Sequence, residues 1–247
     1  MMNEKFWNID KIINQYYLGD CIEILPYIPD NTFDLIILDP PYSFPAKHYQ
    51  TRKDFKRTLG DFGLLEHFFK NVFREVERVL KDTGFLYVFC NEESYPLFWF
   101  YCFFFAKKIR MLIWNKITSI NGYHWRHQYE VILFAIMFNS PKVKTGDGDI
   151  LKCRAVPKDE REHPAQKPEE IITKLIMKSS SPNQLIGDFF AGSGIVLKIA
   201  KKLGRNYFGI EYDEFYYEKS KKQLEAIELI AELPSKEIKT LDKYLEK

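Results

Sequence analysis

The stretch FDLIILDPPYSF, residues 33–44, places an apolar run directly before an acidic residue and two prolines. The aliphatic residues 35–38 are typical of a strand that is buried on both faces of a sheet. Proline has a fixed φ and no backbone N–H, so Pro40 and Pro41 hold the chain extended and leave its carbonyl groups accessible. The stretch therefore predicts a central strand that ends in a stiff corner carrying the Asp39 carboxylate and the Tyr42 ring.

Strand and helix patterns alternate on both sides of this stretch. Strands are expected over 15–19, 34–38, 85–90, 109–114, 129–138, 185–190 and 206–211. Helices are expected over 64–80, 94–106, 169–179 and 195–203, and a last one ends near Pro234, while 139–162 is expected to be irregular. This alternation predicts a single three-layer α/β domain over 1–247, in which a mostly parallel, seven-stranded Rossmann-like sheet carries helices on both faces.

A second motif, DFFAGSG at 188–194, closes one expected strand and opens a helix. Gly192 and Gly194 allow a sharp turn, and the free N–H groups of a helix start can bind an anion. Glu211 ends the next strand, nineteen residues after Gly192, where an acid that binds ribose hydroxyls usually lies. The third glycine of the dinucleotide pattern is missing, because position 197 is Leu. A nucleoside ligand without a pyrophosphate therefore fits better, and S-adenosylmethionine is one such ligand.

Acidic residues follow or end three of the expected strands, at Asp20, Asp39 and Glu211. In open α/β sheets, ligands bind outside the carboxyl ends of the strands. One such carboxylate would be unremarkable. Three of them together with a glycine loop predict a single crevice.

The corner 39–42 has the composition to hold an amino group. The Asp39 carboxylate and the Pro40 carbonyl offer two hydrogen-bond acceptors in a stiff arrangement. Accepting both hydrogens of an exocyclic amine favours a pyramidal nitrogen, whose lone pair can attack an electrophile. Stacking of Tyr42 on a base would contribute about 1–3 kcal/mol. The alternative is a proline-rich strand-to-loop corner that the aspartate merely caps.

Several segments, in this order, resemble the β group of DNA amino-methyltransferases, which use S-adenosylmethionine and have a circularly permuted arrangement. The segments are YLGDCIEIL (17–25), DPPY (39–42), LKDTGFLYVF (80–89), IWNK (113–116), HPAQKP (163–168), DFFAGSG (188–194) and LGRNYFGIEYDEFYYEKSKKQ (203–223). The resemblance covers about residues 15–225 and implies one catalytic domain of that fold.

The resemblance also implies roles for individual residues. Asp20 is expected to bind the adenine of the cofactor, Lys167 to approach its carboxylate and Glu211 to bind its ribose. The expected catalytic residues are Asp39, Pro40, Pro41 and Tyr42. The expected cofactor-binding residues are Asp20, Cys21, Lys167, Asp188, Phe190, Ala191, Gly192, Ser193, Gly194, Glu211 and Tyr212.

Basic residues gather in the middle of the chain, although the formal net charge is only +2. Such clusters suit the phosphates of DNA, although each charge could equally belong to a solvated surface. The expected DNA contacts are Lys47, Arg52, Lys53, Lys56, Arg57 and Arg126. The basic loop 43–63 and the segment 115–128 are therefore candidates for target recognition, beside the segment 139–162.

Two features depart from the family pattern. Ile195 stands where Thr or Ser usually follows the last glycine of the loop, which removes a hydrogen bond and puts some cofactor contacts in question. The segment 139–162, where target recognition usually resides, has only 24 residues. Either the target is short or recognition is shared with another region.

The function implied is site-specific methyl transfer from S-adenosylmethionine to the N6 amino group of adenine in double-stranded DNA, after base flipping. Asp in the first position of DPPY favours adenine, and cytosine N4 is the alternative. More distant alternatives are methylation of RNA or of protein glutamine, an NAD-dependent oxidoreductase, and an inactive DNA-binding relative. A homodimer and a cognate restriction endonuclease are further partners to test.

The remaining composition indicates the setting of the protein. Four scattered cysteines without a paired spacing favour neither a disulfide scaffold nor a zinc site, so a reduced, cytoplasmic location is expected. The N-terminus lacks the apolar core of a signal peptide. The apolar run 96–106 is too short to span a bilayer, so it is expected to be a buried helix, or an oligomer contact if part of it is exposed.

Overall fold

The computed structural model describes residues 6–41, 59–117, 124–143, 146–157, 159–161, 163 and 166–227, and the side chains of α2 from residue 66 onward. Within these residues, eight strands form one sheet in the order β1-β8-β7-β2-β3-β5-β4-β6. The strands are β1 (Gln15–Leu18), β2 (Phe33–Leu38), β3 (Leu80–Cys90), β4 (Lys108–Asn115), β5 (Tyr129–Ile136), β6 (Ile150–Lys152), β7 (Leu185–Asp188) and β8 (Asn206–Glu211). Neighbouring strands pair in parallel except β5, which runs antiparallel to both β3 and β4.

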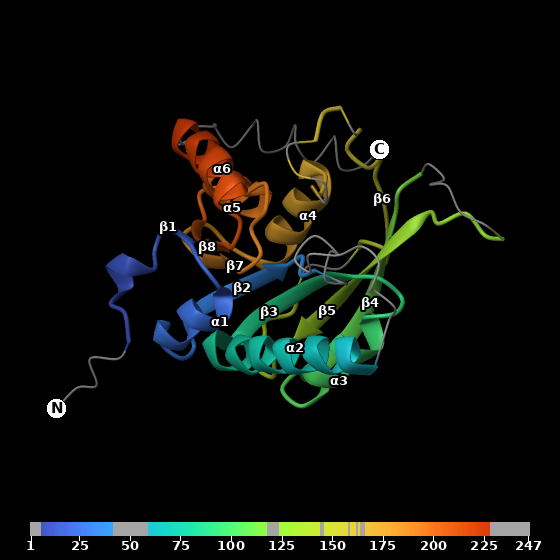
Figure 1. Cartoon of the computed structure of the whole chain (residues 1–247), viewed down its shortest axis with the longest axis horizontal. Coiled ribbons are helices and arrows are strands. Elements are labelled where there is room, and N and C mark those ends of the chain that lie inside the picture. The colour runs from blue at the N-terminus through green and yellow to red at the C-terminus, as the bar shows by residue number, and fades with distance from the viewer. Residues whose placement is uncertain are drawn as a thin grey trace.

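Helices cover both faces of the sheet. They are α1 (Cys21–Ile24), α2 (Leu59–Val79), α3 (Tyr95–Phe103), α4 (Glu169–Ser179), α5 (Ile195–Lys202) and α6 (Glu214–Ala226), with short 3-10 turns at Ile9–Lys11 and Leu25–Tyr27. Figure 1 shows α1, α2 and α3 on one side of the sheet and α4, α5 and α6 on the other. The mostly parallel, three-layer α/β fold is therefore confirmed, while the circular permutation stays a prediction.

The strand β2 lies at the centre of this arrangement and is buried on both faces. Its side chains alternate: Leu35 and Ile37 pack with residues of α4 and α5, whereas Ile36 and Leu38 pack with residues of α2 and α3. None of the four is more than 1% exposed. The alternation continues past the end of the strand, so Asp39 extends the row of Leu35 and Ile37 toward the α4 side.

Some boundaries differ from those expected. Seven strands were predicted; the eighth, β6, is a three-residue strand inside the supposedly irregular segment 139–162, and it pairs with β4. β3 begins at Leu80 rather than 85, because Leu80 pairs with Phe33 across an irregularity in the ladder. β7 ends at Asp188 rather than 190, because the Asp188 carboxylate accepts the N–H of Phe190 at 3.1 Å and turns the chain. The described part of the last helix ends at Ala226.

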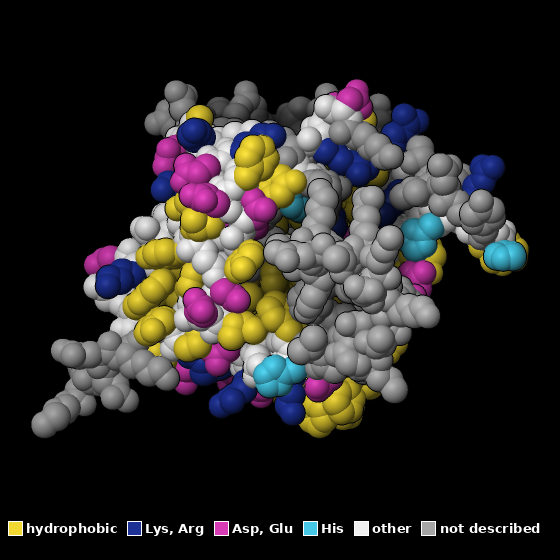
Figure 2. Space-filling view, in the orientation of Figure 1, with side chains coloured by type: hydrophobic (Ala, Val, Ile, Leu, Met, Phe, Trp, Pro, Cys, Tyr) yellow, Lys and Arg dark blue, Asp and Glu magenta, His cyan; other side chains and the backbone are white. Residues whose placement is uncertain are grey.

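The aromatic helix α3 is buried on one side only. Phe98 and Cys102 are fully buried, but Trp99, Phe100, Phe103 and Phe104 are 38–67% exposed. Figure 2 shows hydrophobic side chains gathered at the lower edge of the molecule, where α3 lies. The expected buried helix is thus confirmed for the inner side only. For an exposed part the expectation was an oligomer contact, and that contact stays a prediction. In the part of the chain that the structure describes, no helix is both long enough and apolar enough to cross a membrane.

Candidate active site

The sheet order places the carboxyl ends of β1, β8, β7 and β2 side by side along one edge. The acidic residues at or just after these ends are, in the same order, Asp20, Glu211, Asp188 and Asp39. Backbone hydrogen bonds continue between the ends: Gly19 N–H donates to the Glu211 carbonyl, and Ala191 N–H donates to the Ile210 carbonyl, both at 2.9 Å. Asp39 and the glycine loop, far apart in the sequence, therefore follow neighbouring strands.

The glycine loop turns from β7 into α5 through two left-handed residues. Gly192 has φ of 50° and Gly194 has φ of 68°, conformations that strain residues with a Cβ atom. A Cβ atom on Gly194 would lie 3.0 Å from the Cβ atom of Ser220 in α6. Ala191 and Ser193, also predicted to bind the cofactor, are 4% and 6% exposed. The loop is therefore tightly packed and depends on both glycines.

Glu211 holds this loop against the end of β8. Its Oε2 accepts the N–H of Gly192 at 2.6 Å, and its Oε1 accepts the N–H of Asp213 at 2.8 Å. Burial raises the pKa of Glu211, against the opposing effect of these N–H donors. Burial also raises the pKa of Asp188 well above its usual value. The role of Glu211 in binding ribose stays a prediction.

Close packing of α5 is achieved without a third glycine in the loop. Leu197 is fully buried, and a Cβ atom on Gly209 of β8 would lie only 2.4 Å from its Cδ1 and 2.8 Å from Cδ2 of Tyr16. The glycine that permits close approach is thus on the strand instead of on the helix. Ile195, the other departure from the family pattern, is 6% exposed within the same apolar cluster. An aliphatic side chain suits that position.

Asp20 and Cys21 lie at the start of α1. The Asp20 carboxylate caps this helix by accepting the N–H of Ile22 at 2.9 Å. Cys21 is 4% exposed, and burial raises the pKa of its thiol to about 12. Phe190 is partly buried against Phe68, with ring centroids 6.2 Å apart. Their contacts with a cofactor stay predictions.

Lys167 joins the DPPY corner to β5. Its Nζ lies 2.6 Å from Oδ2 of Asp39 and 2.9 Å from Oε1 of Glu130, and Lys116 Nζ lies 3.0 Å from the other carboxylate oxygen of Glu130. Burial alone would lower the pKa of Lys167, but the two carboxylates raise it overall. The sequence analysis did not predict that Glu130 and Lys116 belong to this site. The available signal was a carboxylate inside the apolar run YEVILFAIMF.

His163 belongs to the same HPAQKP segment and faces the glycine loop. Its ring lies edge-on to that of Tyr216, with centroids 4.3 Å apart. A Cβ atom on Gly192 would lie 3.4 Å from its Nδ1. Burial lowers the pKa of His163. The segment thus lies against the glycine loop through His163 and bonds Asp39 through Lys167.

The other predicted residues divide into those that the structure describes and those that lie outside the described residues. Pro40 is buried, Pro41 is partly buried, and Tyr212 is 67% exposed. The remaining predicted catalytic and DNA-contacting positions lie outside the described residues, except Arg126. These positions are Tyr42, Lys47, Arg52, Lys53, Lys56 and Arg57.

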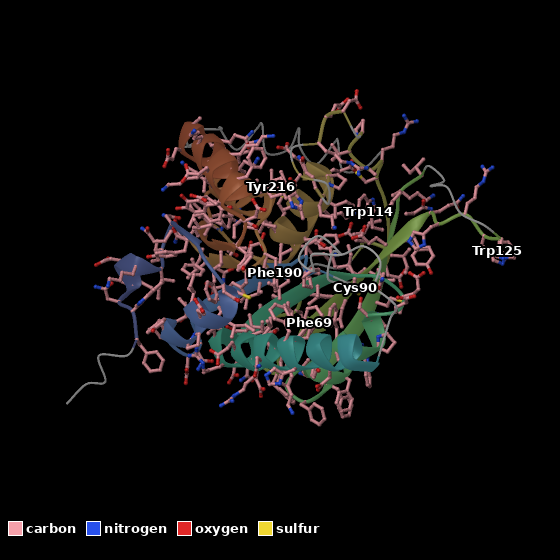
Figure 3. The ribbon with its side chains drawn as sticks, in the orientation of Figure 1. Phe69, Cys90, Trp114, Trp125, Phe190 and Tyr216 are labelled. Atoms are coloured by element: carbon pink, nitrogen blue, oxygen red, sulfur yellow. The ribbon has the colours of Figure 1, made fainter. Side chains whose placement is uncertain are left out.

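Arg126 lies on an arm between β4 and β5, of which 116–117 and 124–128 are described. The N–H of Lys116 donates to the carbonyl of Gln128 at 2.8 Å, which extends the pairing beyond the two strands. Trp125 is 91% exposed, and Figure 3 shows it at the far tip. Because β4 runs in the same direction as β2, the arm leaves the sheet at the edge where Asp39 lies.

Comparison with known proteins shows the family to which this chain belongs. The family model described as DNA methylase matches residues 33–222. Type II methyltransferase M.HinfI of Haemophilus influenzae is 30% identical over 273 residues, which cover 92% of this chain and 72% of the relative. DNA adenine methyltransferase YhdJ of Escherichia coli (strain K12) is 27% identical over 84% of this chain and 81% of its own length.

The fold is shared with a solved structure. The structure of M1.HpyAVI in complex with SAM matches with a TM-score of 0.61 at 23% identity, over 85% of this chain and 98% of that one. The match to the DNA methylase family extends from β2 into α6 and includes DPPY and the glycine loop. The chain therefore belongs to the family of S-adenosylmethionine-dependent DNA methyltransferases that modify the amino group of adenine or cytosine.

Proposed function

We propose that this enzyme methylates the N6 amino group of adenine in double-stranded DNA, at a specific sequence. The observation that carries the proposal is the position of the Asp39–Pro40 corner, which ends the strand adjacent to the one that leads into the glycine loop. Adenine is favoured over cytosine because the relative YhdJ is a DNA adenine methyltransferase, and its similarity extends over 84% of this chain. Asp in the first position of the motif agrees with that choice.

The donors and acceptors at the strand ends fit S-adenosylmethionine, which supplies an electrophilic methyl group on a sulfonium centre when bound. The carboxylates of Glu211 and Asp20 suit the ribose hydroxyls and the adenine amino group. Gly192 and Gly194 carry no Cβ atom, so the loop that leads into α5 suits close approach of the amino-acid end. Lys167 carries the positive charge that suits the carboxylate of that end.

The DPPY corner is proposed to hold the target. The base leaves the duplex, because its amino group is otherwise out of reach. Asp39 and the Pro40 carbonyl accept the two amino hydrogens, and Tyr42 stacks on the ring. The amino nitrogen would form a bond to the methyl carbon as the carbon–sulfur bond breaks, which would leave S-adenosylhomocysteine. The methylated amine would then lose one proton to solvent, so the step needs no general base. Alignment of the two reactants supplies much of the acceleration.

The arm between β4 and β5 is proposed to contact the DNA beside the site. It leaves the same edge of the sheet as Asp39 and carries Trp125 and Arg126 at its exposed end. Figure 2 shows basic and histidine side chains along this projection. A cation that meets a phosphate gives salt-dependent affinity, and an exposed ring can stack on a base. We assign recognition to this arm together with the segments 43–63 and 139–162, within one catalytic domain over 1–247.

The function is tested with S-adenosylmethionine labelled in its methyl group. The protein is incubated with mixed-sequence double-stranded DNA, RNA and protein substrates in parallel, and labelled DNA is digested to nucleosides. N6-methyladenine supports the proposal. N4-methylcytosine replaces it by the cytosine alternative. Label found only in RNA or protein contradicts both.

A further inference from the structure

A buried chain of alternating charges leads from the catalytic corner to β5. It runs from Asp39 through Lys167 and Glu130 to Lys116, with successive N–O distances of 2.6, 2.9 and 3.0 Å. The side chains of Lys167, Glu130 and Lys116 are 7%, 11% and 13% exposed. Charges at this depth are tolerated only with partners, because desolvation is otherwise uncompensated.

The alternation of the strands explains why these charges meet. Asp39 follows Ile37 by two positions, and Glu130 precedes Ile132 by two, so each continues a row that packs in the cluster under α4 and α5. Lys167 enters from the segment that leads into α4 on that same side. The ends of β2 and β5 thus present their carboxylates to one ammonium group.

We propose that Glu130 is a positioning residue for methyl transfer: it holds Lys167 at the point from which the ammonium group orients the Asp39 carboxylate. This inference rests on the proposed function, because it assigns Asp39 to the amino group of the target base. Glu130 acts through Lys167 and does not itself touch the reacting atoms.

The reason lies in the geometry around the Lys167 ammonium group. It has three N–H donors. Oδ2 of Asp39 lies 2.6 Å from its Nζ and Oε1 of Glu130 lies 2.9 Å from it, and the centroid of the Phe89 ring is 5.0 Å away. Loss of Glu130 removes one of these restraints, so the ammonium group can move and change which way Asp39 faces. A misplacement of about 1 Å can lower a rate by about 100-fold.

The test compares three variants of the full-length protein. Glu130→Gln keeps the shape of the side chain and removes its charge. Glu130→Asp keeps the charge and withdraws the carboxylate by one methylene group. Glu75→Gln is the control, because Glu75 is also a partly buried, ion-paired carboxylate, bonded to Arg78 at 2.6 Å on α2. Methyl transfer to DNA gives kcat and the KM for DNA, and thermal melting shows whether each variant is folded.

We expect kcat to fall about 10- to 100-fold in Glu130→Gln and less in Glu130→Asp, with the KM for DNA within about 3-fold of wild type. Glu75→Gln keeps the wild-type kcat. If Glu130→Gln does not fold, the test is made with folded Glu130→Asp. A kcat of Glu130→Asp below that of the wild type supports the proposal, and a kcat equal to that of the wild type overturns it. A kcat for Glu130→Gln no lower than that of Glu75→Gln also overturns it.

A second measurement needs neither cofactor nor DNA. The titration of Lys167, followed by NMR of 13C-labelled lysine side chains, reports on its neighbours Asp39, Glu130 and His163. We expect a lower pKa for Lys167 in Glu130→Gln and no change in Glu75→Gln; an unchanged pKa in both overturns the proposal. Absence of any methylation of DNA by the wild type would instead defeat the proposed function, so the two failures are distinguishable.

Discussion

The Nζ atom of Lys167 lies 2.6 Å from Oδ2 of Asp39, although 128 positions separate the two residues. The two side chains are 7% and 22% exposed, so the pair is largely shielded from water. The contact attaches the DPPY corner to the segment before α4. That segment also reaches the glycine loop through His163. The candidate sites for the methyl donor and for the target base are therefore linked through one short segment.

Removal of the Lys167 charge should destabilise the fold. Lys167→Met leaves two carboxylates without their shared cation, and breaking a buried ion pair costs about 3–5 kcal/mol. The free energy of unfolding in urea measures this loss. In the Lys167→Met background, Glu130→Gln should cost less than it does in the wild type, with a coupling energy of about 0.5–3 kcal/mol. Purely additive losses would contradict a shared network.

Lys202→Met is the control for this experiment. Lys202 pairs with Glu169 at 3.0 Å, but the two side chains are 35% and 60% exposed. Such surface pairs contribute about 0–1 kcal/mol. A loss in Lys202→Met as large as that in Lys167→Met would show that burial is not the cause.

The glycine loop should tolerate no side chain at its second glycine. Gly194→Ala puts a residue with a Cβ atom into the left-handed backbone conformation, which costs about 1–2 kcal/mol. The new Cβ atom would also lie 3.0 Å from the Cβ atom of Ser220. Gly204→Ala carries the same backbone strain at φ of 70°, but its Cβ atom would meet nothing within 4 Å. We expect Gly194→Ala to unfold more easily than Gly204→Ala and to bind S-adenosylhomocysteine more weakly, as measured by calorimetry. Equal binding by both variants would contradict a role for the loop in holding the cofactor.

The contact between Leu197 and Gly209 explains how α5 approaches the sheet. Gly209→Ala would bring a methyl group within 2.4 Å of Leu197, and overpacking of this kind costs about 1–3 kcal/mol. The same substitution should cost less in a Leu197→Ala background, because only the contact with Cδ2 of Tyr16 at 2.8 Å then remains. Urea denaturation of the single and double variants checks this. An equal cost in both backgrounds would show that Leu197 does not set the distance.

The sequence was sufficient for the features that local patterns determine. The apolar run 35–38, followed by Asp39 and two prolines, predicted a central strand and its polar end. It was insufficient where a partner lies far along the chain. The role of Gly209 depends on Leu197 of the neighbouring helix, and the position of Lys167 depends on Glu130, so neither follows from spacing. β6 was missed because only Leu151 of its three residues is buried, which is too short a pattern to detect.

The outer side of α3 shows a further limit. An apolar run of eleven residues predicts a buried helix, yet Phe103 and Phe104 are 58% and 67% exposed. Composition alone cannot tell which side of a uniformly apolar helix faces the sheet. That side is decided by where α2 and β5 lie, which is a property of the assembled fold.

The arm should contribute to DNA affinity without contributing to stability. Trp125 is 91% exposed, so Trp125→Ala should leave the melting temperature unchanged. Loss of a stacked ring should weaken DNA binding by about 1–3 kcal/mol. Arg126→Ala should lower the slope of log K against log salt by about 1, as expected for one lost phosphate contact. Fluorescence anisotropy with labelled DNA at several salt concentrations measures both.

Phe103→Ala provides the comparison for the arm. It removes an exposed ring from α3 and leaves the arm intact. Its affinity for DNA should equal that of the wild type. If Phe103→Ala and Trp125→Ala weaken binding equally, the effect is a general loss of surface hydrophobicity and the arm is not a DNA contact.

The most direct test of the account is the methylation rate of Asp39→Asn compared with that of Asp34→Asn. Asp39 directly follows β2, whereas Asp34 lies near the start of that strand. The Asp34 carboxylate accepts from Lys81 Nζ at 2.8 Å and from the N–H of Leu185 at 2.9 Å. We predict that Asp39→Asn lowers the single-turnover rate of N6-methyladenine formation by about 100-fold or more, while S-adenosylhomocysteine still binds. Folded Asp34→Asn should keep its rate. Full activity in Asp39→Asn would contradict the catalytic assignment and the site built on it.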